Sequence, residues 1–355
     1  MLAGLGSAVM VLPHRICIQH GGAGERTCRT SVRGGKRPLL SIVHHVTIGA
    51  SPSGSSMADL NGVAFEPFQT PYASAMFVAK ESWMNNGIKW NAGDAGSHHL
   101  FLYIDILGFK ELIDSGFEIR RIYERMDRLN AQTDTDFRCI VFSDTMVVYA
   151  SKAWQNAPSQ GLMWLIEFAQ ELFYFLIALD VHMRGYITYG EFYHYELTHF
   201  EAYYGKALVK CYEREKTIKC TGVFIDDEIA KYSDIFHLTR YDEHSHYVHV
   251  MQSLDDISVS YAEYPYPGWM LEATGMEWWV AYMLVYLKRT YRRAEDTALP
   301  EDVRLKHSNA WKMISSRHDG LCRRLVEAEF DFSAVVTMDW TECLRRIGTD
   351  DGAWG

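Results

Sequence analysis

Two aspartates are the residues of this chain best placed to do chemistry. Asp105 lies in the apolar run FLYIDILGF (101–109), and Asp144 lies 39 positions further along, in CIVFSDTMVVY (139–149). Both runs are rich in β-branched and aromatic residues, which predicts buried strands. A carboxylate inside a buried strand is unfavourable unless it is paired or binds a cation. Two such carboxylates side by side would suit Mg²⁺ or Mn²⁺, which prefer hard oxygen ligands.

Each aspartate also has a purely structural interpretation. Asp105 could cap the helix expected after its strand, and Asp144 could occupy a turn, where aspartate is common. Arg184 and Glu191, which flank a later strand, could likewise form an ordinary ion pair. If the aspartates instead bind metal, two ions about 4 Å apart would activate a hydroxyl nucleophile and neutralise a triphosphate. The pair then points to phosphoryl or nucleotidyl transfer.

The turn after the first aspartate adds a second part of such a site. Gly108 lets a ligand approach the backbone closely, and Phe109 begins a predicted helix whose first N–H groups are free. Helix N-termini bind phosphate groups through these N–H groups. We therefore expect the β- and γ-phosphates of a nucleotide at Gly108 and Phe109.

Apolar patterns of period two and of period three to four predict the elements that position these residues. Their order, β-α-β-β-α-β-α-β, is that of a ferredoxin-like sandwich of the α/β (α+β) class. Strands are expected at 99–107, 137–150 (a strand pair turning near Ser143 and Asp144), 182–192 and 221–226, and helices at 108–131, 160–180 and 203–216. Alternate positions of a strand share a face, so Phe101, Tyr103 and Asp105 should point the same way.

The composition limits the domain organisation and the partners. The chain has 355 residues, 48% of them hydrophobic, which is enough for a substantial core. Its formal net charge of −10 argues against a nucleic-acid partner, because such proteins usually carry a basic face. We expect a lead-in segment at 57–98, a catalytic domain at 99–235 and a mostly helical extension at 236–355. The strongest helix of that extension, 277–293, carries aromatic residues that fit a core or a subunit contact.

Residues 1–56 differ from the rest of the chain. They contain six Lys or Arg against a single acid, Glu25, and they are rich in Gly, Ser and His. Three interpretations remain open: a targeting peptide with the apolar stretch 2–12, a disordered basic arm, or a start assigned too early, with Met57 as the true first residue.

Cysteine usage and hydropathy favour a cytoplasmic protein without a membrane segment. The seven cysteines are scattered and include no CxxC pair, which fits a reducing compartment and gives no zinc motif. The most apolar stretch, 162–179, is interrupted by Glu167, Gln170 and Glu171, so no continuous apolar run reaches the ~18 residues of a membrane span.

Four segments together resemble the adenylate/guanylate cyclase catalytic-domain family. They are YIDILGF (103–109), FSDTM (142–146), MRGYITYGE (183–191) and YYGKALVKCYERE (203–215). More narrowly, they resemble the bacterial pyrimidine cyclases of Pycsar antiphage systems, over about residues 99–230. The resemblance implies a cyclase that makes a second messenger in antiviral defence, which a separate cyclic-nucleotide-binding effector reads.

The resemblance also implies roles for particular residues. Two divalent ions, Mn²⁺ or Mg²⁺, would be held by Asp105, Asp144 and the main-chain carbonyl of Ile106. Lys206 and Lys210 are candidates for substrate contacts, although a solvated helix face explains them equally well. Cyclase-like domains usually build their sites between two subunits, so a head-to-tail homodimer is expected.

Departures from the purine cyclases bear on the choice of base. By position, Val209 and Glu213 replace the Asn and Arg that act on the transition state, and Ile140 approximately replaces the Lys that reads a purine. Another basic residue of the helix, or a partner subunit, would have to supply the missing pair. Bulky side chains such as Tyr103 could fill the space that a purine leaves. We therefore expect UTP as substrate and cyclic UMP as product, with CTP as the second choice.

A function of a different class remains open. The chain could be a catalytically degenerate module of the cyclase fold that binds a nucleotide or a protein partner. The presence of both aspartates favours the enzyme, whereas the loss of the Asn/Arg pair favours the module.

Overall fold

The computed structural model describes residues 9–12, 15–18, 97–134, 136–150, 154, 156–260 and 263–348. The chain divides into two compact units, Met1–Met76 and Phe77–Gly355. In the first unit, β1 (Val9–Leu12) and β2 (Arg15–Ile18) form an antiparallel pair. Most of the segment 1–56, and the lead-in up to residue 96, lie outside the described residues.

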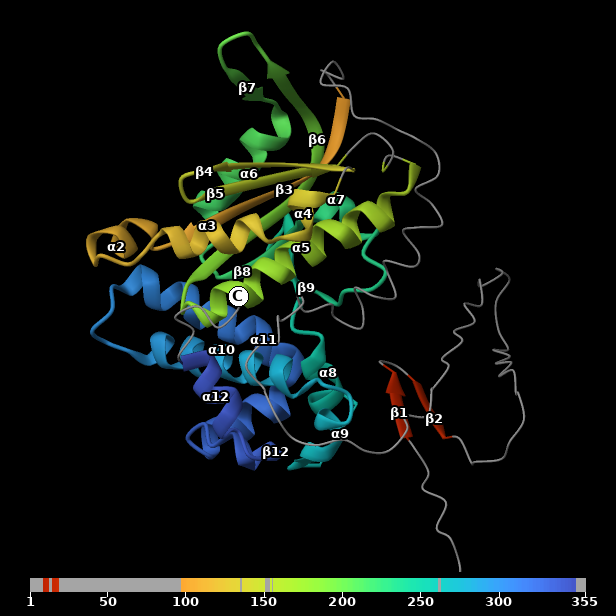
Figure 1. Ribbon diagram of the computed structural model, residues 1–355, viewed down its shortest axis with the longest axis vertical. Helices are drawn as coiled ribbons and strands as arrows, with labels where there is room; N and C mark the ends of the chain where they lie inside the picture. The colour runs from red at the N-terminus through yellow and green to blue at the C-terminus, as the bar shows by residue number, and fades with distance from the viewer. Residues whose placement is uncertain are drawn as a thin grey trace, which may run out of the picture. The chain divides into compact units, whose positions relative to one another are not determined.

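The second unit is built on an eight-stranded sheet (Figure 1). The strand order is β4-β5-β3-β6-β8-β10-β9, and β7 pairs with the end of β6. The bounds are β3 Ser97–Leu107, β4 Phe137–Phe142, β5 Thr145–Ala150, β6 His182–Glu196, β7 Glu201–Tyr204, β8 Gly222–Asp226, β9 Leu238–Arg240 and β10 Ser245–Val248. The inner four strands, β4-β5-β3-β6, are antiparallel and have the ferredoxin-like order, so the predicted fold class is confirmed.

The strand β3 is central because its side chains are buried on both faces of the sheet. On one face, the ring of Phe101 packs on Phe192 at 4.8 Å between centroids. On the other face, Leu100 meets the helix α5 (Pro158–Ala178) at Gly161, where a Cβ atom would lie only 2.8 Å from a Leu100 methyl group. Glycine at this position therefore lets α5 approach the sheet closely.

The expected continuous helix at 108–131 is wrong. The chain forms three short helices there, α2 (Phe109–Asp114), α3 (Arg120–Asp127) and α4 (Asn130–Thr133). Gly116 follows α2 with a φ of 76°, and the N–H groups of Gly116 and Phe117 donate to the carbonyls of Ile113 and Leu112. This Schellman arrangement turns the chain out of the helix, although the apolar spacing continues beyond it.

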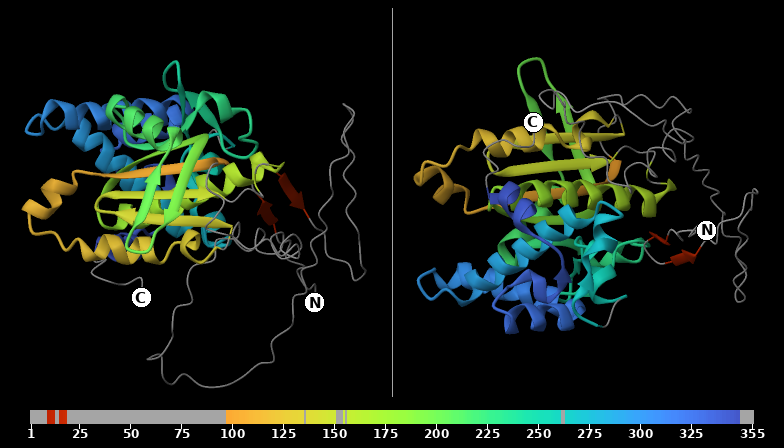
Figure 2. Two further views of the ribbon diagram at one scale, coloured as in Figure 1. Left: turned by 90° about the horizontal axis from the view of Figure 1, so that it is seen from above. Right: turned by 60° about the horizontal axis from the view of Figure 1, so that its bottom comes forward.

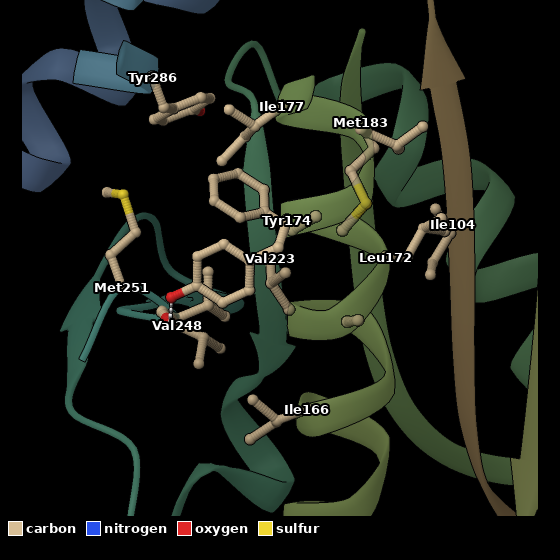
Figure 3. Packing of buried hydrophobic residues seen from close by; sticks show 14 of the residues in the cluster. Ile104, Ile166, Leu172, Tyr174, Ile177, Met183, Val223, Val248, Met251 and Tyr286 are labelled. Carbon is tan, nitrogen blue, oxygen red and sulfur yellow. Dashed lines mark hydrogen bonds between the residues drawn. The ribbon is translucent and has the colours of Figure 1, made fainter. Parts of the chain in front are cut away.

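The helix α5 lies between the sheet and the C-terminal helices. Figure 3 shows Ile104 and Met183 reaching toward α5 from their strands, while Tyr174 of α5 points toward Met251. The Tyr174 hydroxyl donates to the carbonyl of Val250 at 3.4 Å. Within the described residues, α5 is the one helix with the length and apolar content to cross a membrane, and 61% of that stretch is buried.

The helix α6 (Lys206–Thr217) packs against β6 and β3 on the face opposite α5. It begins after Gly205, slightly later than the expected helix at 203–216, because residues 203–204 belong to β7. A Cβ atom at Gly205 would lie 2.3 Å from the carbonyl oxygen of Glu191. Ala207 packs directly against the backbone of Gly190, which has no side chain. This close approach places the whole length of α6 alongside β6.

Past the sheet the chain is mainly helical, as expected for the C-terminal extension. Figures 1 and 2 show its long helices (blue) on the side of α5 away from the sheet. The remaining elements are α7 Asp227–Ala230, α8 Ser253–Ser258, β11 Tyr266–Pro267, α9 Gly268–Glu272, α10 Glu277–Glu295, α11 Glu301–Glu327, the 3-10 helix η3 Phe332–Ala334, β12 Val336–Thr337 and α12 Thr341–Gly348. The sheet itself continues through β9 and β10, beyond the expected end of the catalytic domain at residue 235.

The aromatic residues of α10 form a core contact within the chain. The ring of Tyr286 packs on Phe173 at 4.7 Å, and Trp279 packs on Tyr174 at 4.8 Å between centroids. Tyr282 and Tyr286 are buried. Tyr282 and Tyr286 are therefore core residues, whereas a subunit contact through the half-buried Trp278 and Trp279 stays a prediction.

Candidate active site

The sheet brings Asp105 and Asp144 together at one end of β3. Asp105 stands opposite Thr145 in the β3–β5 pairing, one residue after Asp144. The N–H of Ile106 donates to the carbonyl of Asp144 at 2.9 Å. The two aspartates, 39 positions apart in sequence, thus lie close together: Asp105 belongs to β3, and Asp144 lies in the turn that leads into β5, the neighbouring strand.

A tight turn presents Asp144. Its preceding residue, Ser143, has a left-handed φ of 53°, which closes the hairpin between β4 and β5. The hydroxyl of Tyr123 on α3 donates to the carbonyl of Ser143 at 3.1 Å. The hairpin that carries Asp144 is therefore held from the side by α3.

Asp105 is a half-buried, paired carboxylate and not a helix cap, since Gly108 occupies the capping position before α2. Its Oδ2 lies 3.0 Å from an Nη of Arg184, and its side chain is 16% exposed. Burial raises the pKa of Asp105 to about 6. The neighbouring Arg184 lowers that pKa, while the negative charges of Glu215 and Asp144 raise it.

The residues at this end of the sheet fit a divalent cation. Hydrogen bonds and ion pairs of the described residues leave Oδ1 of Asp105 and the half-buried carboxylate of Asp144 without a partner. These are hard oxygen donors, the kind that Mg²⁺ and Mn²⁺ prefer. Among the described residues, no group of three or more His, Cys, Asp or Glu has metal-binding geometry. A cation here would therefore depend on two carboxylates, with the main-chain carbonyl of buried Ile106 as the third protein ligand that the resemblance implies.

Tyr103, Gly108 and Phe109 lie near this pair. Tyr103 shares a strand face with Asp105, and its hydroxyl lies 3.3 Å from Oγ1 of Thr145. Gly108 has a φ of 72° and is exposed, so its backbone is open to a ligand. The side chain of Phe109 is buried, which leaves only its backbone N–H for a phosphate.

Lys206 and Lys210 lie elsewhere in the same protomer. Lys206 is 84% exposed and its Nζ lies 3.0 Å from Glu191, which stands opposite His98 in the β3–β6 pairing. Asp105 stands opposite Arg184 in that pairing, seven residues away along β6, which corresponds to roughly 23 Å. Lys210 pairs with Asp226 at the end of β8. One protomer therefore does not bring these lysines to the aspartates.

The structure adds two residues that sequence reasoning missed. Arg184 pairs with both Asp105 and Glu215, so the alternative of an ion pair between Arg184 and Glu191 is wrong. The two residues lie on opposite halves of β6, and Glu191 instead pairs with Lys206. The strand register would have placed Arg184 opposite Asp105. Glu215 lies in the last turn of α6, and no pattern in the sequence indicated that this turn would reach Arg184.

Comparison with known proteins finds similarity to solved structures only. The chain matches no protein-family model and no curated protein sequence. The adenylyl cyclase CyaB from P. aeruginosa is similar at 9% identity and a TM-score of 0.34, covering 43% of this chain and 95% of that one. The guanylyl cyclase domain of the RhoGC fusion protein from the aquatic fungus Blastocladiella emersonii is similar at 10% identity and a TM-score of 0.31, covering 43% and 97%. A class III adenylyl cyclase-like ATP-binding protein from Pseudomonas aeruginosa is similar at 11% identity and a TM-score of 0.30, covering 45% and 43%.

Proposed function

We propose that this protein is a nucleotide cyclase that converts UTP to 3′,5′-cyclic UMP and pyrophosphate. The observation that carries the proposal is the pair of Asp105 on β3 and Asp144 in the adjoining β4–β5 turn, each with a carboxylate oxygen left free by the described residues. An unpaired, half-buried carboxylate beside a second one is unfavourable without a cation. The ferredoxin-like sheet supports the proposal, because Asp105 and Asp144 meet at one end of it.

The chemistry requires the ribose 3′-hydroxyl to attack the α-phosphorus while pyrophosphate leaves in line. When bound, two divalent ions would lower the pKa of that hydroxyl and neutralise the triphosphate. Asp105 and Asp144 would hold the ions, and the exposed backbone at Gly108 would receive phosphate oxygens. The chain's own contribution is positioning and charge neutralisation, as in other phosphoryl transfers.

The choice of uracil rests on the side chains around the site. Tyr103 stands on the Asp105 face of β3 and would limit the space beside bound ions. Val209 and Glu213, at the positions where purine cyclases carry Asn and Arg, are both exposed. A site that hydrogen-bonds uracil would reject cytosine by about tenfold to a hundredfold, since one buried polar group would stay unpaired.

A head-to-tail homodimer forms part of the proposal. The separation of Lys206 from Asp105 within one protomer means that this lysine can contact the substrate only from a second copy. The β6–β7 hairpin offers a contact surface for that copy: the ring of Tyr193 stacks on Tyr204 at 4.7 Å, and Tyr204 and Phe200 are exposed. The product would then act on a separate cyclic-nucleotide-binding effector in the cytoplasm, in antiviral defence.

A nucleotide-binding module without catalysis is the second candidate, because one observation favours it. Arg184 occupies Oδ2 of Asp105, so a guanidinium already neutralises one of the two carboxylates. In such a module, a nucleotide would bind without turnover.

A competition among the four nucleoside triphosphates tests the proposal. The purified full-length chain is incubated with equimolar ATP, GTP, CTP and UTP and Mn²⁺, and the products are identified by mass. We expect cyclic UMP to dominate. Dominant cyclic CMP would overturn the choice of uracil alone, a purine product would overturn the pyrimidine assignment, and binding without any product would favour the module.

A further inference from the structure

Arg184 is shared between two carboxylates through a single nitrogen. One Nη donates to Oδ2 of Asp105 at 3.0 Å and to Oε1 of Glu215 at 2.5 Å. The other Nη donates to the main-chain carbonyl of Ile218 at 2.8 Å. The side chain of Arg184 is only 5% exposed, so the guanidinium is a buried charge with fixed acceptors.

A cation that binds Asp105 has to compete with this guanidinium. If Asp105 were the only carboxylate of Arg184, a metal ion on Asp105 would leave a buried positive charge unpaired, which is strongly unfavourable. Glu215 removes that difficulty, because Arg184 can keep Glu215 and the Ile218 carbonyl when Asp105 turns to the metal. The side chain of Glu215 is 23% exposed, and it comes from α6 rather than from the strands that carry the aspartates.

We infer that Glu215 is a positioning residue that holds Arg184 and thereby makes Asp105 available to a divalent cation. This inference rests on the proposed function, since it takes Asp105 as a metal ligand. It gives the last turn of α6 a part in the site without making Glu215 a ligand, in line with the absence of a three-residue metal cluster among the described residues.

The affinity of the full-length chain for Mn²⁺ alone tests the inference, without nucleotide and without turnover. Electron paramagnetic resonance of free Mn²⁺ gives the dissociation constant. Glu215→Gln should raise it about tenfold, because a charge-assisted hydrogen bond to Arg184 is lost. Glu213→Gln, on the exposed face of the same helix, is the matched control and should leave the dissociation constant unchanged.

A second variant separates the hydrogen bond from the charge. Glu215→Asp keeps the negative charge but shortens the reach to Arg184, so the inference predicts a weakened affinity close to that of Glu215→Gln. Wild-type affinity in Glu215→Asp would show that Glu215 acts through its charge alone and would overturn the inference. Unchanged affinity in both variants, with a lower melting temperature, would show a merely structural ion pair and would overturn it as well.

Asp105→Asn distinguishes a failure of this inference from a failure of the proposed function. Loss of Mn²⁺ binding in Asp105→Asn, combined with wild-type binding in Glu215→Gln, refutes the role of Glu215 but leaves the metal site intact. Unchanged Mn²⁺ binding in Asp105→Asn refutes the metal site, and with it both proposals. Circular dichroism of each variant confirms that the fold is retained.

Discussion

The two aspartates have different surroundings, although both belong to the same end of the sheet. Both are half-buried, but Asp105 pairs with Arg184, whereas Asp144 sits in a hairpin turn without a partner among the described residues. An apolar strand with a single acid predicted both positions. The position of Arg184 opposite Asp105 is set by the register between β3 and β6, and the position of Glu215 is set by the packing of α6. Neither position could be predicted from local sequence patterns.

At this scale the prediction concerns the carboxylates themselves. Asp105→Ala and Asp144→Ala should each lower cyclic nucleotide formation by more than about a hundredfold, because metal-assisted charge stabilisation is worth several kcal/mol. Asp144→Ala should leave the melting temperature unchanged, since no ion pair of a described residue is lost. The control is Asp127→Ala on the exposed side of α3, which should retain full activity. Turnover near the wild-type value in either site variant would show that these acids are structural.

At the scale of elements, the sequence predicted the sheet and its flanking helices more accurately than it predicted the segment between β3 and β4. Period-two patterns gave the strands, and the long apolar pattern gave α5 close to its observed bounds, Pro158–Ala178. The segment 108–131 kept an apolar spacing of three to four residues, but Gly116 ends α2 with a left-handed φ. The left-handed conformation of Gly116 therefore ends the helix, although the apolar spacing of three to four residues continues on both sides of it.

Gly116→Ala should test that explanation. A Cβ atom at Gly116 meets no other heavy atom within 4 Å, so any loss of stability comes from the left-handed φ of 76°. We expect the free energy of unfolding in urea to fall by about 1 kcal/mol, the usual penalty of a non-glycine residue in this region. Gly116→Asn should lose less, because asparagine tolerates the left-handed region. Equal stability of wild type and Gly116→Ala would mean that α2 does not end here through glycine.

At the scale of the whole molecule, the C-terminal helices are joined to the sheet by buried side chains. The hydroxyl of Tyr286 on α10 lies 2.8 Å from Oγ1 of Thr221, just before β8. The rings of His182 on β6 and His307 on α11 meet edge to face at 4.6 Å. The sequence predicted a helical extension, but not these contacts, because each joins residues more than 60 positions apart.

The histidine contact predicts an acid-sensitive junction. Burial lowers the pKa of His307 to about 4 and that of His182 well below its usual value of 6.5. The unfolded chain therefore binds more protons than the folded one below pH 6.5, so these histidines lower stability as the pH falls from 6.5 toward 4. Each contributes about 1.4 kcal/mol per pH unit in that window.

His307→Gln isolates this effect from the other titrating groups. Between pH 7 and pH 5, the free energy of unfolding of the wild type should fall by about 2 kcal/mol more than that of His307→Gln. The same substitution at the exposed residue His244, His244→Gln, provides the control. A difference between wild type and His307→Gln that is the same at both pH values would contradict a neutral, buried His307.

Sharing of the site between two copies gives a prediction about mixtures. Asp144→Ala and Lys206→Ala should each be inactive alone if Lys206 reaches the substrate bound to a second copy. Mixing them should restore up to about a quarter of the wild-type activity, because about half of the dimers are then mixed and each mixed dimer holds one intact site of two. Activity of a strict monomer in sedimentation, or no recovery on mixing, would contradict the shared site.

Product identification with UTP and Mn²⁺ tests the central claim most directly. The purified full-length chain is incubated with UTP, and the products are separated and identified by mass, with pyrophosphate measured in parallel. The two-aspartate site predicts cyclic UMP and pyrophosphate in equal amounts, and neither product from Asp144→Ala. Intact UTP, or hydrolysis to UDP or UMP without a cyclic product, would contradict the assignment of this chain as a nucleotide cyclase acting on UTP.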